Sequence, residues 1–230
     1  MKIKDWIYTH RYIWLIGYTL VYLLWFRLLE LMTNREWNTI HVALDDLIPF
    51  EEIFVIPYFL WFAYIVVAIL YFMFTSKQDF VNCTLFLFIG MTICLVIYSL
   101  WPNVQNLRPV QFPRDNFLTD IVKQLYVTDT STNVCPSIHV FNSIGVHIAI
   151  AKSKRLRNHP IIVGSSFCLM VSICLSTVFL KQHSVFDGVC AIVLAIFMYL
   201  IVYKVDYENM RQNGRWNRRD DKDVVRNPSI

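Results

Sequence analysis

The stretch TNVCPSIH (residues 132–139) joins a polar, turn-forming segment to an apolar segment that runs on to about residue 150. Pro136 suits the first position of a helix, where its missing N–H costs nothing. The free N–H groups that follow, together with the positive end of the helix dipole, form a site suited to an anion. Ser137 would add a hydroxyl donor, and His139 a group that exchanges a proton near neutral pH. The stretch therefore predicts a phosphate pocket at the mouth of a membrane helix, or a simple helix cap with an interfacial histidine.

The composition is typical of an integral membrane protein. Of the 230 residues, 56% are hydrophobic and 16% are aromatic, and the mean hydropathy is +0.45. Soluble domains of this size are less apolar, and aromatic side chains gather where membrane helices meet water. The net charge of +4 is small and is explained by basic loops, so we expect a membrane and no nucleic acid as partner.

Six apolar segments each come close to the roughly twenty residues that a helix needs to cross a bilayer. They lie at about residues 12–32, 53–74, 80–100, 137–153, 160–180 and 184–204. We therefore expect an all-α, integral membrane six-helix bundle that forms a single domain over residues 1–204. Residues 205–230 are polar and mixed in charge, which predicts a disordered cytoplasmic tail.

The lysines and arginines predict the orientation of this bundle. With a cytoplasmic N-terminus, fifteen basic residues fall inside, and only Arg35, Arg108, Arg114, Lys123 and Lys181 fall outside. Because cytoplasmic loops carry the excess of positive charge, both termini are predicted to be cytoplasmic in a multi-pass protein of the plasma membrane. The long outer segment between the third and fourth spans is expected to be re-entrant or interfacial, with a short surface helix near residues 115–126.

The other long outer segment, residues 33–52, carries four carboxylates. Paired carboxylates could bind a cation, but a solvated acidic loop is the commoner case and is the interpretation favoured here. The six cysteines show no C-x-x-C spacing and the chain has no H-E-x-x-H motif, so neither a metal nor another cofactor is expected. The four carboxylates are Asp45, Asp46, Glu51 and Glu52.

A second stretch with candidate catalytic residues, KQHSVFD (residues 181–187), joins the fifth predicted span to the sixth on the outer side. His183 and Asp187 are four residues apart and so share one helix face. The aspartate can accept the imidazole Nδ1–H, which leaves Nε2 free as a nucleophile or base. The alternative is a buried pair that only ties helices together. Since ionisable groups on membrane helices are costly, a function is the default hypothesis.

The two stretches together resemble the type 2 phosphatidic acid phosphatase superfamily over roughly residues 101–190. The family pattern is K-x-x-x-x-x-x-R-P, then P-S-G-H, then S-R-x-x-x-x-x-H-x-x-x-D. Its lysine, glycine and arginine positions hold Trp101, Ile138 and Thr177, so the chain looks more like the divergent branch that includes inositol-phosphorylceramide synthases and bacterial relatives. The matching residues are Arg108, Pro109, Pro136, Ser137, His139, Ser176, His183 and Asp187.

The resemblance implies a metal-independent lipid-phosphate phosphatase that works through a phosphohistidine at the outer face. His183 would attack phosphorus, oriented by Asp187, and His139 would protonate the leaving group. The phosphate oxygens would be held by Ser137, Arg108 and, in a role suggested by its position alone, Lys181.

Two alternatives remain open at this point. A phosphotransferase would use the same intermediate and pass a phospholipid head-group phosphate to an alcohol. A non-catalytic membrane protein could keep the same fold, and the absence of the family's lysine and arginine favours it. The two histidines and the aspartate argue for catalysis.

Overall fold

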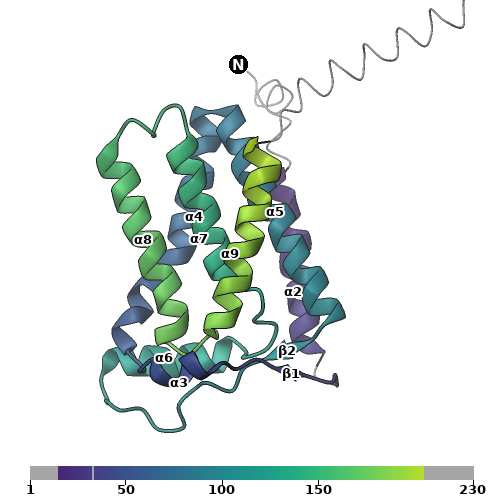
Figure 1. Cartoon of the computed structure of the whole chain (residues 1–230), viewed down its shortest axis with the longest axis vertical. Helices are drawn as coiled ribbons and strands as arrows, with labels where there is room; N and C mark the ends of the chain where they lie inside the picture. The colour runs from purple at the N-terminus through teal and green to yellow at the C-terminus, as the bar shows by residue number, and fades with distance from the viewer. Residues whose placement is uncertain (1–14, 33, 205–230) are drawn as a thin grey trace, which may run out of the picture.

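The computed structural model describes residues 15–32 and 34–204, and these are mostly helical (Figure 1). The predicted tail at 205–230 and the start of the first predicted span lie outside the described residues. In the described part, four helical segments are long and apolar enough to cross a membrane. They contain α4 (Val55–Thr75), α5 (Lys77–Leu100), α8 (Pro160–Phe179) and α9 (Val185–Tyr199), the last continued by a π-helical turn, Leu200–Lys204.

Two further helices run alongside these four (Figure 1). Helix α2 (Tyr18–Leu31) packs on α5, and α7 (Ile138–Lys152) packs against α4, α5, α8 and α9 at the centre of the bundle. The described part of α2 has 14 residues and α7 has 15, or about 21–23 Å at 1.5 Å per residue. Within residues 15–32 and 34–204, four helical segments of spanning length therefore match four of the six segments predicted from the sequence.

An outer layer of short elements lies across one end of the helices (Figure 1). It contains a parallel pair of strands, β1 (Asn38–Thr39) and β2 (Asn103–Val104), with α3 (Ala43–Leu47), a 3-10 turn η2 (Glu52–Phe54) and α6 (Phe117–Thr128). Helix α6 occupies the segment where a surface helix was predicted. Its buried Val122 and Leu125 pack with Tyr58 of α4, so this layer is attached to the bundle through an apolar cluster.

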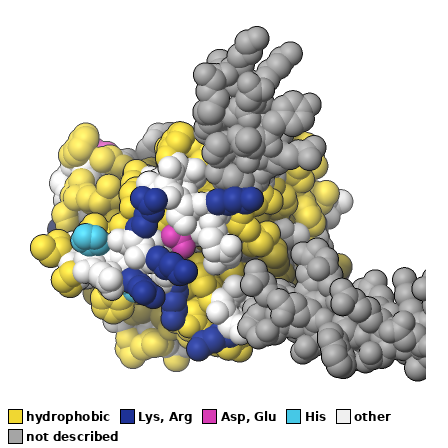
Figure 2. Space-filling view, turned by 90° about the horizontal axis from the view of Figure 1, so that it is seen from above, with side chains coloured by type: hydrophobic (Ala, Val, Ile, Leu, Met, Phe, Trp, Pro, Cys, Tyr) yellow, Lys and Arg dark blue, Asp and Glu magenta, His cyan; other side chains and the backbone are white. Residues whose placement is uncertain are grey.

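The opposite end of the bundle carries the basic residues of the connections between helices. Figure 2 shows Lys and Arg side chains gathered on this end. They come from the start of α5, the end of α7 and the connection between α7 and α8. These residues are Lys77, Lys152, Lys154, Arg155 and Arg157.

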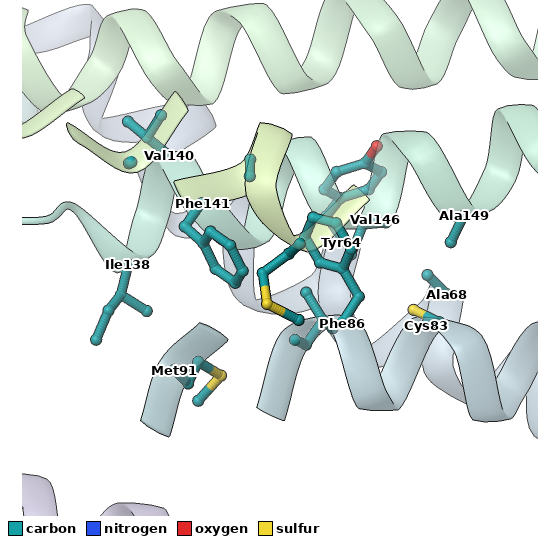
Figure 3. Packing of buried hydrophobic residues seen from close by; sticks show 14 of the residues in the cluster. Tyr64, Ala68, Cys83, Phe86, Met91, Ile138, Val140, Phe141, Val146 and Ala149 are labelled. Atoms are coloured by element: carbon teal, nitrogen blue, oxygen red, sulfur yellow. The ribbon is translucent and has the colours of Figure 1, made fainter. Parts of the chain in front are cut away.

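Close packing of α7 against α5 holds the start of α7 in place. The rings of Phe86 and Phe141 stack with their centroids 5.1 Å apart, and Figure 3 shows them meeting between the helices. A Cβ atom added to Gly90 would lie 1.9 Å from the Phe141 ring, and one added to Gly145 would lie 2.6 Å from Phe86. Both glycines are therefore required for the two helices to approach this closely.

Candidate active site

The connection between α8 and α9 places His183 and Asp187 in contact. His183 Nδ1 lies 3.3 Å from Asp187 Oδ2, and the same oxygen accepts a 3.0 Å hydrogen bond from the Ser184 backbone N–H. Ser184 is the N-cap of α9, so Asp187 closes a capping box while it contacts the imidazole. Both side chains are buried. The contact that the i, i+4 spacing predicts is present in the structure.

His139, the second residue of α7, lies between two aromatic rings of α4. Its ring centroid is 4.6 Å from that of Tyr58 and 4.2 Å from that of Trp61. The His139 and His183 rings are 5.8 Å apart and tilted by 60°. No hydrogen bond fixes the His139 ring within the described residues, so aromatic packing orients it toward His183.

Ser137 caps α7 and ties that helix to α9. Its Oγ accepts from the Val140 backbone N–H at 3.4 Å, and its own N–H donates to the Asp187 carbonyl at 3.1 Å. This second bond brings the start of α7, and with it His139, beside the first turn of α9. Ser137 is fully buried and does not line the cavity described below, so the structure uses its hydroxyl as a helix cap.

Asn103, which the sequence analysis did not single out, shapes the loop before α7. Its Oδ1 accepts from the backbone N–H groups of Val134 and Cys135 at 2.7 and 2.9 Å. Its Nδ2 donates to the carbonyls of Trp101 and Cys135 at 3.0 and 3.2 Å. Because this buried asparagine bonds to four backbone groups, it fixes the loop. The residues around Asn103 in the sequence do not indicate this role.

An apolar cavity of about 680 Å³ leads to the two histidines. It runs between α2, α4 and α5, and its lining includes His139, Gln182 and His183. Cavities of this size hold small organic ligands, and an apolar one suits a hydrocarbon chain. Representative apolar lining residues are Tyr22, Phe26, Phe59, Phe62, Ile69, Leu87, Phe88 and Met91.

Arg108 lies one residue behind the cavity wall. Its guanidinium donates to the carbonyls of Tyr126 and Asp129 at 2.9 and 2.8 Å and to Gln182 Oε1 at 2.7 Å. It also stacks over the Tyr126 ring at 4.4 Å. Burial lowers the pKa of Arg108, although an arginine remains charged throughout the physiological range. Arg108, predicted as a phosphate ligand, therefore does not line the cavity itself but contacts Gln182, which does.

Lys181 does not join the site, contrary to the sequence-based prediction. Its Nζ donates to the carbonyls of Asp45 at 2.7 Å and Ile48 at 2.5 Å, and it does not line the cavity. Burial lowers the pKa of Lys181, while the nearby carboxylate of Asp45 acts in the opposite direction. The residue has a φ of 51°, and its side chain extends into the outer layer instead of back over His183.

Replacement of Lys181 by methionine should therefore lower stability. Two buried carbonyls would lose a charged donor, which is worth on the order of 1.5–3 kcal/mol. Thermal unfolding in detergent measures the effect. Lys123→Met is the matched control, because Lys123 pairs with the exposed carboxylates of Asp115 and Asp120, and its loss should leave the midpoint almost unchanged. Equal midpoints for the two variants would contradict this role.

The acidic outer segment is not a solvated loop as favoured above. Asp45 is buried; its Oδ1 accepts from the Val185 N–H at 2.8 Å and its Oδ2 from the Ser184 hydroxyl at 2.6 Å, so it caps α9. Glu52 is also buried and binds Arg114 Nε at 2.7 Å. The reason is electrostatic, because a carboxylate at the N-terminus of a helix meets free N–H groups and the positive end of its dipole.

The remaining two acids of that segment have partners near the surface. Glu51 also pairs with Arg114, at 2.6 Å, and Asp46 pairs with His41 at 2.8 Å. Over residues 15–32 and 34–204, no three metal-ligating side chains lie close enough together to hold an ion.

Four residues around the histidines were not singled out from the sequence. Tyr58 and Trp61 lie on an apolar helix, where aromatic residues carry no signal of their own. Asn133 and Gln182 lie within the two stretches that carry the predicted catalytic residues, and that position is the one signal that could have found them. Comparison of the chain with protein-family models, curated proteins and solved structures finds no match, so the case for a function rests on the site itself.

Proposed function

We propose that this protein is a membrane lipid-phosphate phosphatase that works through a phosphohistidine, as its motifs' resemblance to the type 2 phosphatidic acid phosphatases implies. One observation carries the proposal. Two histidines that line an apolar cavity have ring centroids 5.8 Å apart, and one of them contacts a buried carboxylate. A nucleophile, an orienting aspartate and a second histidine within reach of the leaving group are the parts that this reaction needs.

In the first step, Nε2 of His183 attacks phosphorus and the P–O bond to the lipid breaks. His139 gives its proton to the departing alkoxide, while Asp187 accepts the Nδ1–H of His183 and stabilises the positive charge of the imidazole. In the second step, water attacks phosphorus and the P–N bond breaks. His139 takes the proton of that water, so both histidines return to their starting states.

The alternative is a phosphotransferase in which an alcohol replaces water in the second step. Trp101 and Thr177 favour it, because they stand where the hydrolytic family members carry cations. A non-catalytic protein on the same fold remains the rival of another class. It would have no need for the contact between His183 and Asp187 beside a second histidine.

A panel of lipid phosphates incubated with purified protein tests the three functions together. Free phosphate indicates the phosphatase, and a new phosphodiester formed with an added alcohol indicates the phosphotransferase. Activity should persist in EDTA, because the proposed chemistry uses only side chains of the chain itself. Neither product from folded protein, over a broad panel, would favour the non-catalytic alternative.

We further infer that α2, α4, α5, α7, α8 and α9 are the six membrane segments, with the histidines at the extracytoplasmic end and both termini in the cytoplasm. The basic connections lie at the end of the bundle away from the starts of α7 and α9, where His139 and His183 are found (Figure 1). An excess of Lys and Arg at one end is typical of the cytoplasmic side. The outer layer, with α6, would then lie at the outer membrane surface.

Cysteine labelling tests this orientation. A membrane-impermeant maleimide applied to intact cells should label Val110→Cys, which is 98% exposed in the outer layer. It should miss Asn158→Cys, which is exposed in the connection between α7 and α8, until the membrane is permeabilised. The parent protein, with its own six cysteines, is the control for background. The reverse pattern would place the histidines on the cytoplasmic side.

A further inference from the structure

Buried polar atoms that lack a partner are found in the lining of the cavity and directly behind it. Four of the six residues concerned line the cavity, Asp187 contacts His183, and Arg108 contacts Gln182. Native proteins leave few such atoms unpaired, so a cluster of them at one place points to a ligand. In the described part of the chain, these atoms are Trp61 Nε1, Arg108 Nε, both amide atoms of Asn133, Asn142 Oδ1, Gln182 Nε2 and Asp187 Oδ1.

Gln182 presents an N–H donor in a fixed direction. Its Oε1 accepts a 2.7 Å hydrogen bond from Arg108, and a reversed amide would set N–H groups against the guanidinium N–H groups. The Nε2 group is therefore the free end of the amide. Gln182 is only 3% exposed, lines the cavity and directly precedes His183 in the chain. Arg108 thus aligns and polarises this donor without touching the cavity itself.

Asn133 presents a second amide to the cavity. Its backbone has a φ of 56°, a left-handed conformation that asparagine tolerates better than most residues. Its N–H donates to the Asn103 carbonyl at 2.7 Å, which fixes the backbone. The side chain is 4% exposed, lines the cavity and leaves both amide atoms unpartnered.

The charges around the cavity indicate whether it favours a phosphomonoester or a phosphodiester. No lysine or arginine is found among the described residues that line it, whereas Glu30 and Asp129 do line it. A phosphomonoester carries a charge of about −1.5 to −2 at pH 7, with a second pKa of about 6. A phosphodiester lacks that second ionisation and carries one negative charge. Because a buried charge needs compensation, uncharged amides suit the monoanion better than the dianion.

We propose that the amides of Gln182 and Asn133 bind the phosphate oxygens of the substrate in place of cations, with Arg108 as the positioning residue for Gln182. The proposal rests on the histidine site of the proposed function, which the phosphatase and its transferase alternative share, and adds the phosphate ligands of that site. It has a consequence for selectivity, namely that a phosphodiester lipid binds more tightly than the phosphomonoester with the same acyl chains. That order favours the transferase alternative, in which His183 attacks a phosphodiester.

Equilibrium binding tests the proposal without relying on turnover. The protein is the full chain with His183→Ala, so that neither lipid is consumed. The probes are short-chain phosphatidylmethanol and phosphatidate with identical acyl chains at pH 8, and the readout is the Kd from calorimetry in detergent. Phosphatidylmethanol should bind at least tenfold more tightly. Equal affinity, or tighter binding of phosphatidate, would overturn the proposal.

Two substitutions in this background isolate the donors. Gln182→Glu keeps an acceptor for Arg108, so the fold is retained, but it replaces the donor with an anionic oxygen. Asn133→Gly keeps the left-handed backbone and removes the amide. Each should weaken phosphatidylmethanol binding at least tenfold, whereas Gln124→Glu on the exposed face of α6 should have no effect. An unchanged Kd in Gln182→Glu or in Asn133→Gly would overturn the proposal.

The panel assay separates failure of this inference from failure of the proposed function. Loss of binding in the two variants together with an inactive parent protein would support the phosphate ligands and remove the catalytic role. Turnover by the parent protein with unchanged binding in the variants would support the catalytic role and remove Gln182 and Asn133 as phosphate ligands.

Discussion

Replacement of His183 by alanine is expected to abolish turnover of every lipid phosphate while the protein stays folded. The loss should be at least ten-thousand-fold, or about 5.5 kcal/mol of transition-state stabilisation, because the nucleophile itself is removed. The fold should survive, since Asp187 Oδ2 keeps its hydrogen bond from the Ser184 N–H and α9 keeps its cap. Product release gives the rate, and thermal unfolding in detergent shows whether the variant is folded.

His147→Ala is the matched control for that variant. His147 lies on α7, about two turns beyond His139, and is half-buried. Its Nδ1 is 3.1 Å from the Ser166 hydroxyl. Its loss should leave most of the activity. Turnover by the His183 variant within tenfold of the parent, or equal losses in the two variants, would remove His183 from the nucleophilic role.

Removal of the proton donor should give the second-largest effect, and its size should depend on the leaving group. His139→Phe keeps an aromatic ring between Tyr58 and Trp61 but cannot transfer a proton. Turnover of a lipid alkoxide leaving group should fall by about a hundred- to ten-thousand-fold, the usual range for general acid catalysis. A nitrophenyl phosphate ester needs little protonation of its leaving group, so its cleavage should fall much less.

The ratio of the two rates is the measurement that identifies the role of His139. A lost proton affects the poor leaving group selectively, whereas a distorted site slows both substrates alike. Equal losses on the alkyl and nitrophenyl esters would assign His139 a packing role beside Trp61.

Short-range features of the site could be predicted from the sequence. The contact between His183 and Asp187 follows from a spacing of four residues on a helix. A helix start was also predicted close to where α7 begins, although Pro136, predicted as its first residue, lies before the Ser137 N-cap. Such contacts depend on local helix geometry, which residue types and spacing specify directly. For the same reason, the short surface helix near residues 115–126 was found as α6.

Contacts between distant parts of the chain could not be predicted in this way. Asp45 caps a helix 139 and 140 positions later in the chain, through Ser184 and Val185. Lys181 turns toward that same segment, because its carbonyls accept the ammonium protons there. A carboxylate or a lysine in an outer loop is typical of a solvated surface, and only the packing of the outer layer onto the bundle places them inside.

The short length of α7 was also beyond a hydropathy pattern. Helix α7 is apolar over the segment predicted to cross the membrane, but its Ser137 cap and its end at Lys152 limit it to 15 residues. It lies against four other helices, so protein covers much of its surface. Hydropathy measures how apolar a segment is and does not distinguish a lipid-facing helix from one buried among its neighbours.

Trapping of the covalent intermediate tests the central claim most directly. The protein is mixed with a labelled lipid phosphate for less than one turnover, quenched in alkali and digested, and the peptides are analysed by mass spectrometry. The proposed mechanism predicts a phosphorus adduct on His183 that is stable in base, is lost in acid and does not form in the His183→Ala variant. An active enzyme that carries no such adduct, or carries it on another residue, would contradict the mechanism.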